Sequence, residues 1–443
     1  MTIFALSSGI GKAGVAIIRI SGADSKNVLL KLTKAPFPRP RIATLKKINN
    51  INNSRVIDEG IILWFPAPES YTGEDMAEIH VHGSKAVVQS ILNSISKIKN
   101  CRIAEPGEFT KLAFQNGKLD LLKAESIGDL ISAETEIQME QALKIMSGKN
   151  LNKFEEWRSD LLKILSHIEA KIDFPDENLP KDILKNIKKI SKKVTDEIKK
   201  NLDDKGVGEI IRQGFKIAII GPPNVGKSSL LNYLSNRDVA IVSEIAGTTR
   251  DVIEIHLNID GYPVIISDTA GIRASKDQIE KKGIKLTIKK AEEADLKIAI
   301  LDPKKAKNTG FLKKFAGKNT LFVINKIDLG KVKFNKELKK FKPILISLKD
   351  KKNIDVLIKK IKQLLKNSFS DSENILITRE RHRRNLEDCL ESLKLFNSKK
   401  NAGDFDKAAE DLRLACRSLG KITGKFDVEE ILGSIFNDFC IGK

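Results

Sequence analysis

The spacing of apolar residues divides this chain into segments of different texture. Short β-rich runs such as Ala13–Ile20 and Gly60–Phe65, interrupted by prolines, fill residues 1–118 and predict an α+β domain. From residue 119 to about 212 apolar residues recur at three- and four-residue intervals, and no proline occurs between Pro106 and Pro175. This spacing predicts long amphipathic helices.

A third texture extends over residues 213–370, where strand-like runs alternate with helix-like runs and predict a mostly parallel sheet with covered faces. Helical spacing returns after residue 370, in Arg379–Phe396, Phe405–Leu419 and Val428–Phe439. Two helical blocks that flank a complete α/β unit suggest an insertion, because insertions are tolerated where the ends of a domain lie close together. We therefore expect one all-α helical domain formed by residues 119–212 and 371–443, with an α/β domain inserted at 213–370.

Composition limits the possible functions without selecting one. A formal charge of +20 favours a polyanionic partner, because neutralised phosphates release counterions. The excess is mostly lysine spread along the chain, however, and segments such as Ile183–Lys200 and Lys331–Lys362 are equally typical of solvated helix faces or loops. No apolar stretch approaches the roughly 18 residues that span a bilayer, and no signal or transit segment is recognisable, so we expect no membrane attachment.

The four cysteines are far apart and show no C-x-x-C spacing. This arrangement argues against structural zinc or a disulfide framework and favours a reducing cytoplasm. They are Cys101, Cys389, Cys416 and Cys440.

The run Gly221–Ser228 fits the phosphate-loop pattern G-x-x-x-x-G-K-S/T. It follows the apolar run Phe215–Ile220 and opens a helix-like stretch, Ser229–Leu234, which is the setting that such a loop requires. In this pattern Lys227 adds positive charge at the outer phosphates, and the hydroxyl of Ser228 can bind Mg²⁺. The alternative is an ordinary Gly-rich turn.

The run Asn325-Lys326-Ile327-Asp328 narrows the nucleotide to guanine. The Asp328 carboxylate can accept hydrogen bonds from both N1–H and the exocyclic amine of guanine, whereas adenine would leave that charge partly unpaired. An isolated N-K-x-D could be a loop cap, but this one follows the apolar run Thr320–Ile324. Ser347-Leu348-Lys349 matches a further guanine-contact loop loosely, with leucine where alanine is usual.

Two runs between these motifs predict the phosphate-sensing switches. Asp268-Thr269-Ala270-Gly271 follows a strand-like run, so that Asp268 can hold Mg²⁺ through water and the Gly271 N–H can sense the γ-phosphate. Thr248 and Thr249 form the first switch, with Thr249 as the Mg²⁺ ligand. The ordered set predicts a Ras-like α/β P-loop GTPase domain.

The residue after Gly271 is Ile272, where Ras-like enzymes place a glutamine that orients water. An apolar side chain cannot orient water, so hydrolysis needs another polar group and another positive charge. Asn224 provides one solution, because its amide oxygen can bind a monovalent cation, and Glu280 can position water. Arg250 and Arg273 are alternative sources of charge, but surface salt bridges explain them equally well.

Further motifs accompany this set near both ends of the chain. They are Gly14-Val15-Ala16-Ile17-Ile18-Arg19-Ile20-Ser21-Gly22, Tyr71-Thr72-Gly73-Glu74-Asp75, His80-Val81-His82-Gly83, Pro106-Gly107-Glu108-Phe109, Lys118-Leu119-Asp120-Leu121, Ile172-Asp173-Phe174-Pro175-Asp176-Glu177 and Cys440-Ile441-Gly442-Lys443. With these motifs the chain resembles the MnmE family, also called TrmE, of bacterial tRNA-modification GTPases over nearly its whole length.

The resemblance implies a homodimer whose N-terminal domain, residues 1–118, binds 5-formyl- or methylene-tetrahydrofolate as a one-carbon donor. It also implies a complex with the flavoprotein MnmG, which carries FAD. Together the two proteins would form a C5 (carboxymethyl)aminomethyl group on wobble uridine 34 of certain tRNAs. GTP hydrolysis in this family depends on K⁺ and Mg²⁺ and accompanies dimerisation of the GTPase domains.

Carried onto this sequence residue by residue, the resemblance assigns a site to each ligand. Mg²⁺ would bind Ser228 and Thr249, and K⁺ would bind Asn224, Ser243, Ile245 and Thr248. The folate would contact Arg19, Glu78, Lys118 and Lys443. Catalysis would use Glu280, Asn224, Lys227 and, as a minor alternative, Cys440. GTP would contact Asn224, Val225, Gly226, Lys227, Ser228, Ser229, Ser243, Glu244, Ile245, Ala246, Gly247, Thr248, Thr249, Asp268, Thr269, Ala270, Gly271, Asn325, Lys326, Asp328, Ser347, Leu348 and Lys349.

Several of these residues have a plainer explanation. Arg19 can be a strand residue that pairs with a carboxylate at the surface, and Lys118 can be a surface lysine at the start of a helix. His80 and His82 alternate along a strand, but two histidines without a third ligand are more often structural than metal-binding. For Cys440, contact with folate or substrate is favoured over nucleophilic catalysis, which requires a lowered thiol pKa.

Two other classes of GTPase compete with tRNA modification. A ribosome-assembly GTPase would share the GTPase motifs, but it normally adds an RNA-binding module such as a KH fold with G-x-x-G, or a second GTPase domain. A membrane-transport GTPase would need a membrane span. The divided helical domain and the terminal Cys-x-Gly-Lys run favour tRNA modification.

Overall fold

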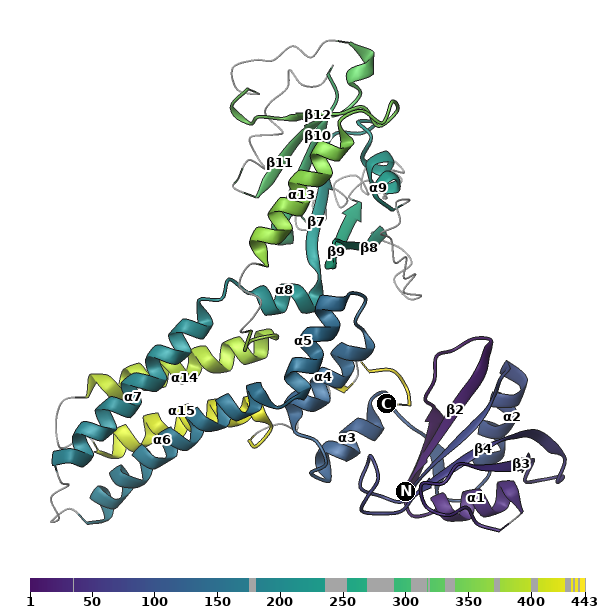
Figure 1. Ribbon diagram of the computed structural model, residues 1–443. Coiled ribbons are helices and arrows are strands. Elements are labelled where there is room, and N and C mark those ends of the chain that lie inside the picture. Colours follow the sequence, from purple (N-terminus) through teal and green to yellow (C-terminus); the bar gives the residue numbers. More distant parts are fainter. Residues whose placement is uncertain are drawn as a thin grey trace, which may run out of the picture. The chain divides into compact units, whose positions relative to one another are not determined.

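The computed structural model divides the chain into two compact units. The first contains Met1–Gly128, Ile145–Lys192 and Asp388–Lys443, and the second contains Asp129–Lys144 and Lys193–Glu387. The structure describes residues 1–34, 36–174, 181–235, 253–268, 291–303, 317, 319–330, 339–369, 375–399, 405–426, 432, 435–436 and 439–442 (Figure 1).

The N-terminal part of the first unit is a six-stranded sheet of order β3-β4-β5-β2-β1-β6. The strands are β1 (Thr2–Leu6), β2 (Ala13–Ser21), β3 (Thr44–Asn49), β4 (Val56–Phe65), β5 (Met76–Gly83) and β6 (Cys101–Ile103). Only the β1–β6 pair is parallel among these neighbours. The strands expected at Ala13–Ile20 and Gly60–Phe65 and the α+β character are confirmed.

One face of this sheet carries the core. Helices α1 (Ser25–Thr33) and α2 (Lys85–Ile95) bury Leu29 and Ile91 against alternate strand residues such as Ile18 and Ile79. Helix α3 (Glu108–Gln115) instead places Phe109 in a smaller cluster with Ile3 and Ala5 of β1. The period of two along each strand separates these two faces.

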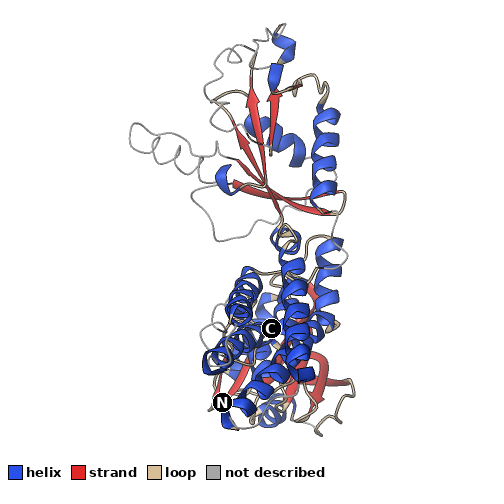
Figure 2. Cartoon of the chain, turned by 90° about the vertical axis from the view of Figure 1, so that its left-hand side faces the viewer, coloured by secondary structure: helices blue, strands red, loops and turns tan. Residues whose placement is uncertain are grey.

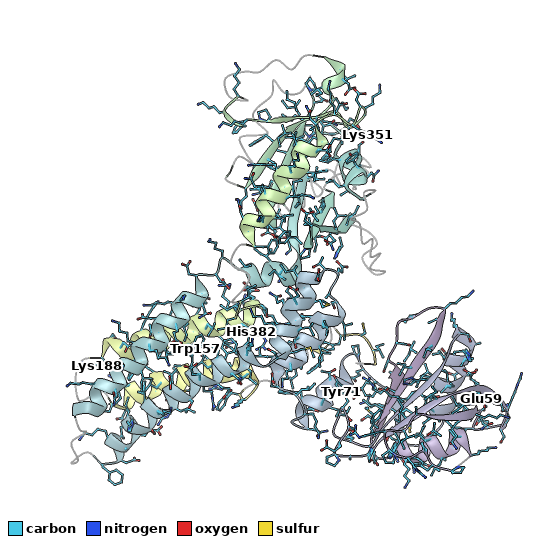
Figure 3. All side chains as sticks on the ribbon, viewed as in Figure 1. Glu59, Tyr71, Trp157, Lys188, Lys351 and His382 are labelled. Carbon is cyan, nitrogen blue, oxygen red and sulfur yellow. The ribbon has the colours of Figure 1, made fainter. Side chains whose placement is uncertain are left out.

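Long helices complete the first unit. Helix α6 (Lys149–Asp173) packs along α15 (Phe405–Thr423), and Trp157 of α6 is fully buried (Figures 1 and 3). Arg413 of α15 reaches Glu169 of α6 at 3.0 Å. Chain segments from before and after residues 213–370 therefore lie together, although they are far apart in the sequence.

The other helices follow the predicted spacing. They are α4 (Leu121–Ile131), α5 (Glu136–Met146), α7 (Lys181–Leu202), α8 (Val207–Gln213) and α14 (Glu380–Ser398). Helix α14 confirms the helix expected at Arg379–Phe396. Of the stretch expected at Val428–Phe439, the described residues Leu432, Ile435 and Phe436 are buried against Leu121.

The second unit contains a six-stranded sheet of order β12-β11-β10-β7-β9-β8, drawn with its flanking helices in Figure 2. Its strands are β7 (Phe215–Ile220), β8 (Ile253–Ile259), β9 (Tyr262–Asp268), β10 (Leu296–Leu301), β11 (Thr320–Ile324) and β12 (Ile344–Leu345). All neighbouring pairs are parallel except β8–β9, which confirms the mostly parallel sheet.

Both faces of this sheet are covered, as expected for a parallel sheet. Along β7, Ile217 and Ile219 face a core shared with α9 (Lys227–Ser235), α13 (Ile354–Ser368) and α8. The alternate residues Ala218 and Ile220 face a second cluster that includes Ala291 and Phe322. No helix in the part of the chain that the structure describes is long and apolar enough to cross a membrane.

Candidate functional site

The phosphate loop lies between β7 and α9, as predicted. Two of its glycines leave no room for a side chain. A Cβ at Gly221 would lie 2.3 Å from the carbonyl oxygen of Ile300, and one at Gly226, where φ is +104°, would lie 2.3 Å from Nδ2 of Asn325. The loop is therefore held tightly against β10 and the segment that follows β11, and only glycine fits at these two positions.

Lys227 is the first residue of α9 and is 8% exposed. Its ammonium group donates hydrogen bonds to the carbonyl oxygens of Gly221 at 2.8 Å and Pro222 at 3.0 Å. Positive charge is thus concentrated inside the loop, at the N-terminus of a helix, where an anionic phosphate is favoured. Asn224 and Ser228 are exposed beside it, and Asn224 has a φ of +62°, which asparagine tolerates better than most residues.

Asn325 joins three predicted loops. It follows β11 and is only 2% exposed. Its Nδ2 donates to the carbonyl oxygen of Val225 at 2.9 Å, and its Oδ1 accepts from the backbone N–H of Leu348 at 3.1 Å. Lys326 donates to the carbonyl oxygen of Asn224. The N-K-x-D run therefore holds the phosphate loop and the Ser347–Lys349 loop in one place, through side chains of its first two residues.

Asp328 is held by the loop after β12. Ser347, which is fully buried, donates its hydroxyl to Oδ1 of Asp328 at 2.8 Å and accepts from the backbone N–H of Asp350 at 3.1 Å. The carboxylate keeps lone pairs for a further donor, since a carboxylate has about four acceptor positions. The loops that follow β7, β11 and β12 thus meet at the carboxyl ends of the strands, where ligands of open α/β sheets bind.

A second cluster of predicted site residues lies on the N-terminal sheet. Arg19 of β2 is in register with Glu78 of β5, and its Nε and Nη2 both reach Oε1 of Glu78, at 3.1 and 2.9 Å. The two side chains are 15% and 14% exposed. The Arg19 guanidinium also lies 5.3 Å from the ring centre of Tyr71 and 5.8 Å from that of Phe109.

The C-terminal tail lies against this cluster. The carbonyl oxygen of Gly442 accepts from Ser7 Oγ at 2.7 Å and from Arg19 Nη1 at 3.5 Å. Ile441 forms a bridge with Pro106, and the exposed Cys440 accepts through its carbonyl oxygen from the N–H of Gly107. The motifs at both ends of the chain are therefore brought together, with the Cys440 side chain at the surface.

Sequence reasoning did not assign the aromatic part of this cluster. Tyr71 and Phe109 lie in motifs that were noted, but nothing in their spacing says that both rings face Arg19. Burial raises the pKa of Tyr71, whose hydroxyl is hydrogen-bonded to Thr110 at 2.8 Å. Lys118 is exposed, and its side chain passes close to Gly73, two residues after Tyr71.

Comparison with known proteins shows the family of the chain. Residues 2–118 match the family model described as the N-terminus of the GTP-binding protein TrmE, and residues 121–440 match the MnmE helical domain. The chain belongs to the MnmE (TrmE) family. The relative from Pelagibacter ubique strain HTCC1062, a tRNA modification GTPase MnmE, is 68% identical over 443 residues and covers both chains completely. The MnmE of Rickettsia bellii strain RML369-C is 47% identical over 452 residues, again with 100% of each chain covered.

Among solved structures the chain is similar to Era in complex with MgGDPNP and nucleotides of 16S ribosomal RNA. This match is 31% identical, covers 34% of this chain and 56% of that chain, and has a TM-score of 0.27. So low a TM-score adds nothing to the argument for membership of the MnmE family.

Other site residues implied by the MnmE resemblance lie outside the described residues. They are Ser243, Glu244, Ile245, Ala246, Gly247, Thr248, Thr249, Thr269, Ala270, Gly271, Glu280 and Lys443. The same holds for Ile272, Arg250 and Arg273 and for the side chain of Asp268, the last residue of β9. Their roles in GTP, Mg²⁺, K⁺ and folate binding stay predictions.

Within the described part of the chain, the histidines and cysteines form no cluster that could hold a metal ion. His80 contacts Glu78 at 3.3 Å and His82 contacts Asp58 at 2.9 Å, and the described residues contain no group of three or more metal-ligating side chains. All four cysteines are free. Burial raises the pKa of the Cys389 thiol and raises that of Cys416 to about 11, so these thiols stay protonated near neutral pH.

Proposed function

We propose that this chain is a GTPase that takes part in tRNA modification. The observation that carries the proposal is the pair of hydrogen bonds made by Asn325 of the predicted guanine loop: its Nδ2 donates to Val225 of the phosphate loop, and its Oδ1 accepts from the N–H of Leu348 in the loop after β12. Support comes from full-length relatives at 68% and 47% identity that carry the name tRNA modification GTPase. A guanine held by the remaining lone pairs of Asp328 would extend its phosphates towards Lys227.

In the proposed reaction the residues of this chain divide the work. Lys227 neutralises the outer phosphates, and Asp328 accepts from the guanine edge. The Ser228 hydroxyl is exposed beside Lys227 at the start of α9, which suits Mg²⁺, and the exposed Asn224 suits K⁺ together with Ser243, Ile245 and Thr248. The two cations supply positive charge that stabilises the phosphates during transfer. Thr249 completes the proposed Mg²⁺ site, and Glu280 orients the attacking water.

The Arg19 cluster is the proposed folate site. A folate has a flat pterin ring that fits beside the Tyr71 and Phe109 rings, hydrogen-bonding groups that suit Glu78, and an anionic glutamate tail that suits Arg19 or Lys118. Because Arg19 and Glu78 now bond to each other, folate binding would exchange part of that ion pair for contacts with the ligand. The folate would supply a one-carbon unit. The tail approaches the site through Gly442, whose carbonyl oxygen accepts from Arg19, and Lys443 stays a proposed folate contact from the resemblance.

We also propose the assembly that the family implies. The sheet face opposite the α1–α2 core exposes Leu45, Ile61 and Val15, which are 65%, 41% and 57% exposed, and such a face favours a homodimer through the N-terminal domain. The contact between α6 and α15 favours insertion of residues 213–370 into one helical domain. With the FAD-bearing MnmG as partner, the complex would modify C5 of wobble uridine 34 in the cytoplasm.

The experiment that tests this proposal is nucleoside analysis of tRNA from cells that lack the protein, complemented with the normal chain or with Asp328→Asn. We expect the wobble C5 modification to disappear, to return with the normal chain, and to stay absent with the variant. Normal wobble nucleosides together with accumulating ribosome precursors would instead support the competing ribosome-assembly GTPase. Asp350→Asn is the matched control, because Asp350 contributes only its backbone N–H to Ser347.

A further inference from the structure

Residues Asp129–Lys144, which we name the α4–α5 corner, belong to the same compact unit as the GTPase sheet. They comprise the end of α4, a short connection and most of α5. The sequence predicts this segment as part of the helical domain at 119–212. Its contacts join it to three different elements around the sheet, and Ile137 packs against the larger core cluster of the sheet itself.

The corner first contacts α8, the helix that leads into β7 and the phosphate loop. Gln138 helps to cap the N-terminus of α5, because its Oε1 accepts a hydrogen bond from the backbone N–H of Thr135 at 3.1 Å. Its Nε2 donates to the carbonyl oxygen of Arg212 at 3.3 Å, and Nε2 of Gln141 donates to that of Gly208 at 3.2 Å. These bonds go to backbone carbonyls of α8, so they fix the helix rather than one mobile side chain.

The corner also joins the two chain segments that lead into and out of the sheet. The Asp129 carboxylate accepts from Nε of Arg212 at 3.0 Å and from Nη2 of Arg379 at 2.7 Å. Arg212 precedes β7, and Arg379 precedes α14. The three side chains are 16%, 26% and 15% exposed, so the pairing is largely withdrawn from solvent and holds these segments together.

The third contact joins two side chains, one from the corner and one from the β8–β9 hairpin. Oε2 of Glu134 lies 2.9 Å from Nδ1 of His256, and the side chains are 27% and 20% exposed. His256 lies on β8, in register with Ile265 of β9. The β8–β9 hairpin links the two predicted switches, because Thr248 and Thr249 precede β8 in sequence and Asp268, which begins the Asp-Thr-Ala-Gly run, ends β9.

We propose that the Glu134–His256 contact couples the nucleotide state of the GTPase domain to the α4–α5 corner. Glu134 and His256 are positioning residues in this scheme, and the inference rests on the proposed GTPase function. The contacts with α8 and those of Asp129 with Arg212 and Arg379 anchor the corner, whereas a single partly exposed side-chain contact is weak enough to be made in one nucleotide state and lost in another. A shift of the hairpin on nucleotide binding then reaches α5 through Glu134.

The test is hydrogen exchange of the α5 amides in the full-length protein, with and without a non-hydrolysable GTP analogue. We expect the normal chain to show nucleotide-dependent protection of α5. In Glu134→Gln and in His256→Gln that response should fall at least about threefold, while affinity for the analogue stays within about twofold, because both residues lie outside the phosphate loop and the guanine-contact loops in sequence. The exchanged pair Glu134→His with His256→Glu should restore much of the response.

The matched control lies on the same hairpin. Asp260, between β8 and β9, pairs with Lys362 of α13 at 2.6 Å, and within the described part of the chain it forms no hydrogen bond or ion pair with the corner. Asp260→Asn should therefore keep the α5 response. A merely structural role for Glu134 would change α5 protection equally with and without nucleotide, so the nucleotide-dependent difference is the decisive quantity.

Each other outcome has a definite meaning. Failure of the normal chain to bind the GTP analogue would refute the proposed function itself. Binding without any response of α5 would overturn the coupling while leaving the function intact. The coupling would also be wrong if the Glu134 and His256 variants responded like the normal chain, or if Asp260→Asn lost the response as fully as they did.

Discussion

Replacing Asn325 by alanine should loosen both nucleotide loops at once. The substitution removes the donor to the Val225 carbonyl and the acceptor for the Leu348 N–H, at a side chain that is 2% exposed. Each buried backbone group left without a partner costs about 1–3 kcal/mol. Water can reach Leu348, which is only partly buried, so we expect a total of about 2–4 kcal/mol.

Two measurements divide this cost between folding and binding. Denaturant unfolding of the full chain reports the loss of stability, and nucleotide titration reports the loss of affinity, which should be roughly 10-fold for each 1.4 kcal/mol felt in the bound state. The control is Asn353→Gly, which also deletes a single amide donor, to the Leu345 carbonyl at 3.0 Å, but at an exposed position where φ is +58°. Its cost should stay near 1 kcal/mol or below, with GTP affinity unchanged.

A second substitution checks the same contact independently. An added methyl group at Gly226 would displace Nδ2 of Asn325, so Gly226→Ala and Asn325→Ala should be strongly non-additive in a double-mutant cycle. The reasoning is refuted if Asn325→Ala unfolds and binds GTP like the normal chain, or if the two substitutions simply add.

Further predictions concern the other site residues. Asp328→Asn should weaken the binding of GTP by roughly 10-fold or more and strengthen the binding of xanthosine triphosphate, because an amide offers a donor where the carboxylate accepts. Competition binding measures this change, and unchanged selectivity between the two nucleotides would count against the guanine assignment. Asn224→Gly keeps the positive φ without strain and removes the side-chain amide. It should therefore abolish the stimulation of the GTPase rate by K⁺, which we expect to be up to about 10³-fold, while GTP still binds. Equal GTPase rates of the normal chain in K⁺ and Na⁺ would contradict the proposed K⁺ site. Arg19→Gln should weaken the binding of a tetrahydrofolate, measured by titration, by roughly 10-fold. Unaltered binding would exclude the proposed exchange of the Arg19–Glu78 ion pair for contacts with the folate. The exposed Cys440 should react with a thiol reagent at pH 8 before the buried Cys416, because burial raises the pKa of the Cys416 thiol to about 11 and keeps it protonated. Mass spectrometry that found Cys416 labelled first would refute this order.

The nucleotide motifs could be predicted because each is a short contiguous run with local chemistry. A strand, glycines, a lysine and a helix start suffice to define a phosphate loop, and the structure places Gly221–Gly226 between β7 and α9 as expected. The bond that holds the loop could not be predicted in this way. Asn325 lies 100 residues beyond Val225, and no local property of either residue specifies that they meet.

The same division applies to the N-terminal cluster. Family resemblance named Arg19 and Glu78 as folate contacts, but their pairing with each other follows from the register of β2 with β5. The proximity of Gly442 to Arg19 likewise depends on how the tail packs against Ser7 and Pro106. A register and a docked tail are set by packing over the whole unit, which no single segment encodes.

The sequence by itself determined the order of the elements, the motif set and the family, since hydrophobic period and motif spacing are properties of neighbouring residues. Only the tertiary structure decided which distant faces meet: α6 against α15, the tail against Arg19, and the α4–α5 corner against the GTPase sheet. The last of these contacts belongs to a segment whose sequence pattern is that of any other amphipathic helix. An amphipathic pattern requires that an apolar face be buried, but it does not specify the partner that buries it.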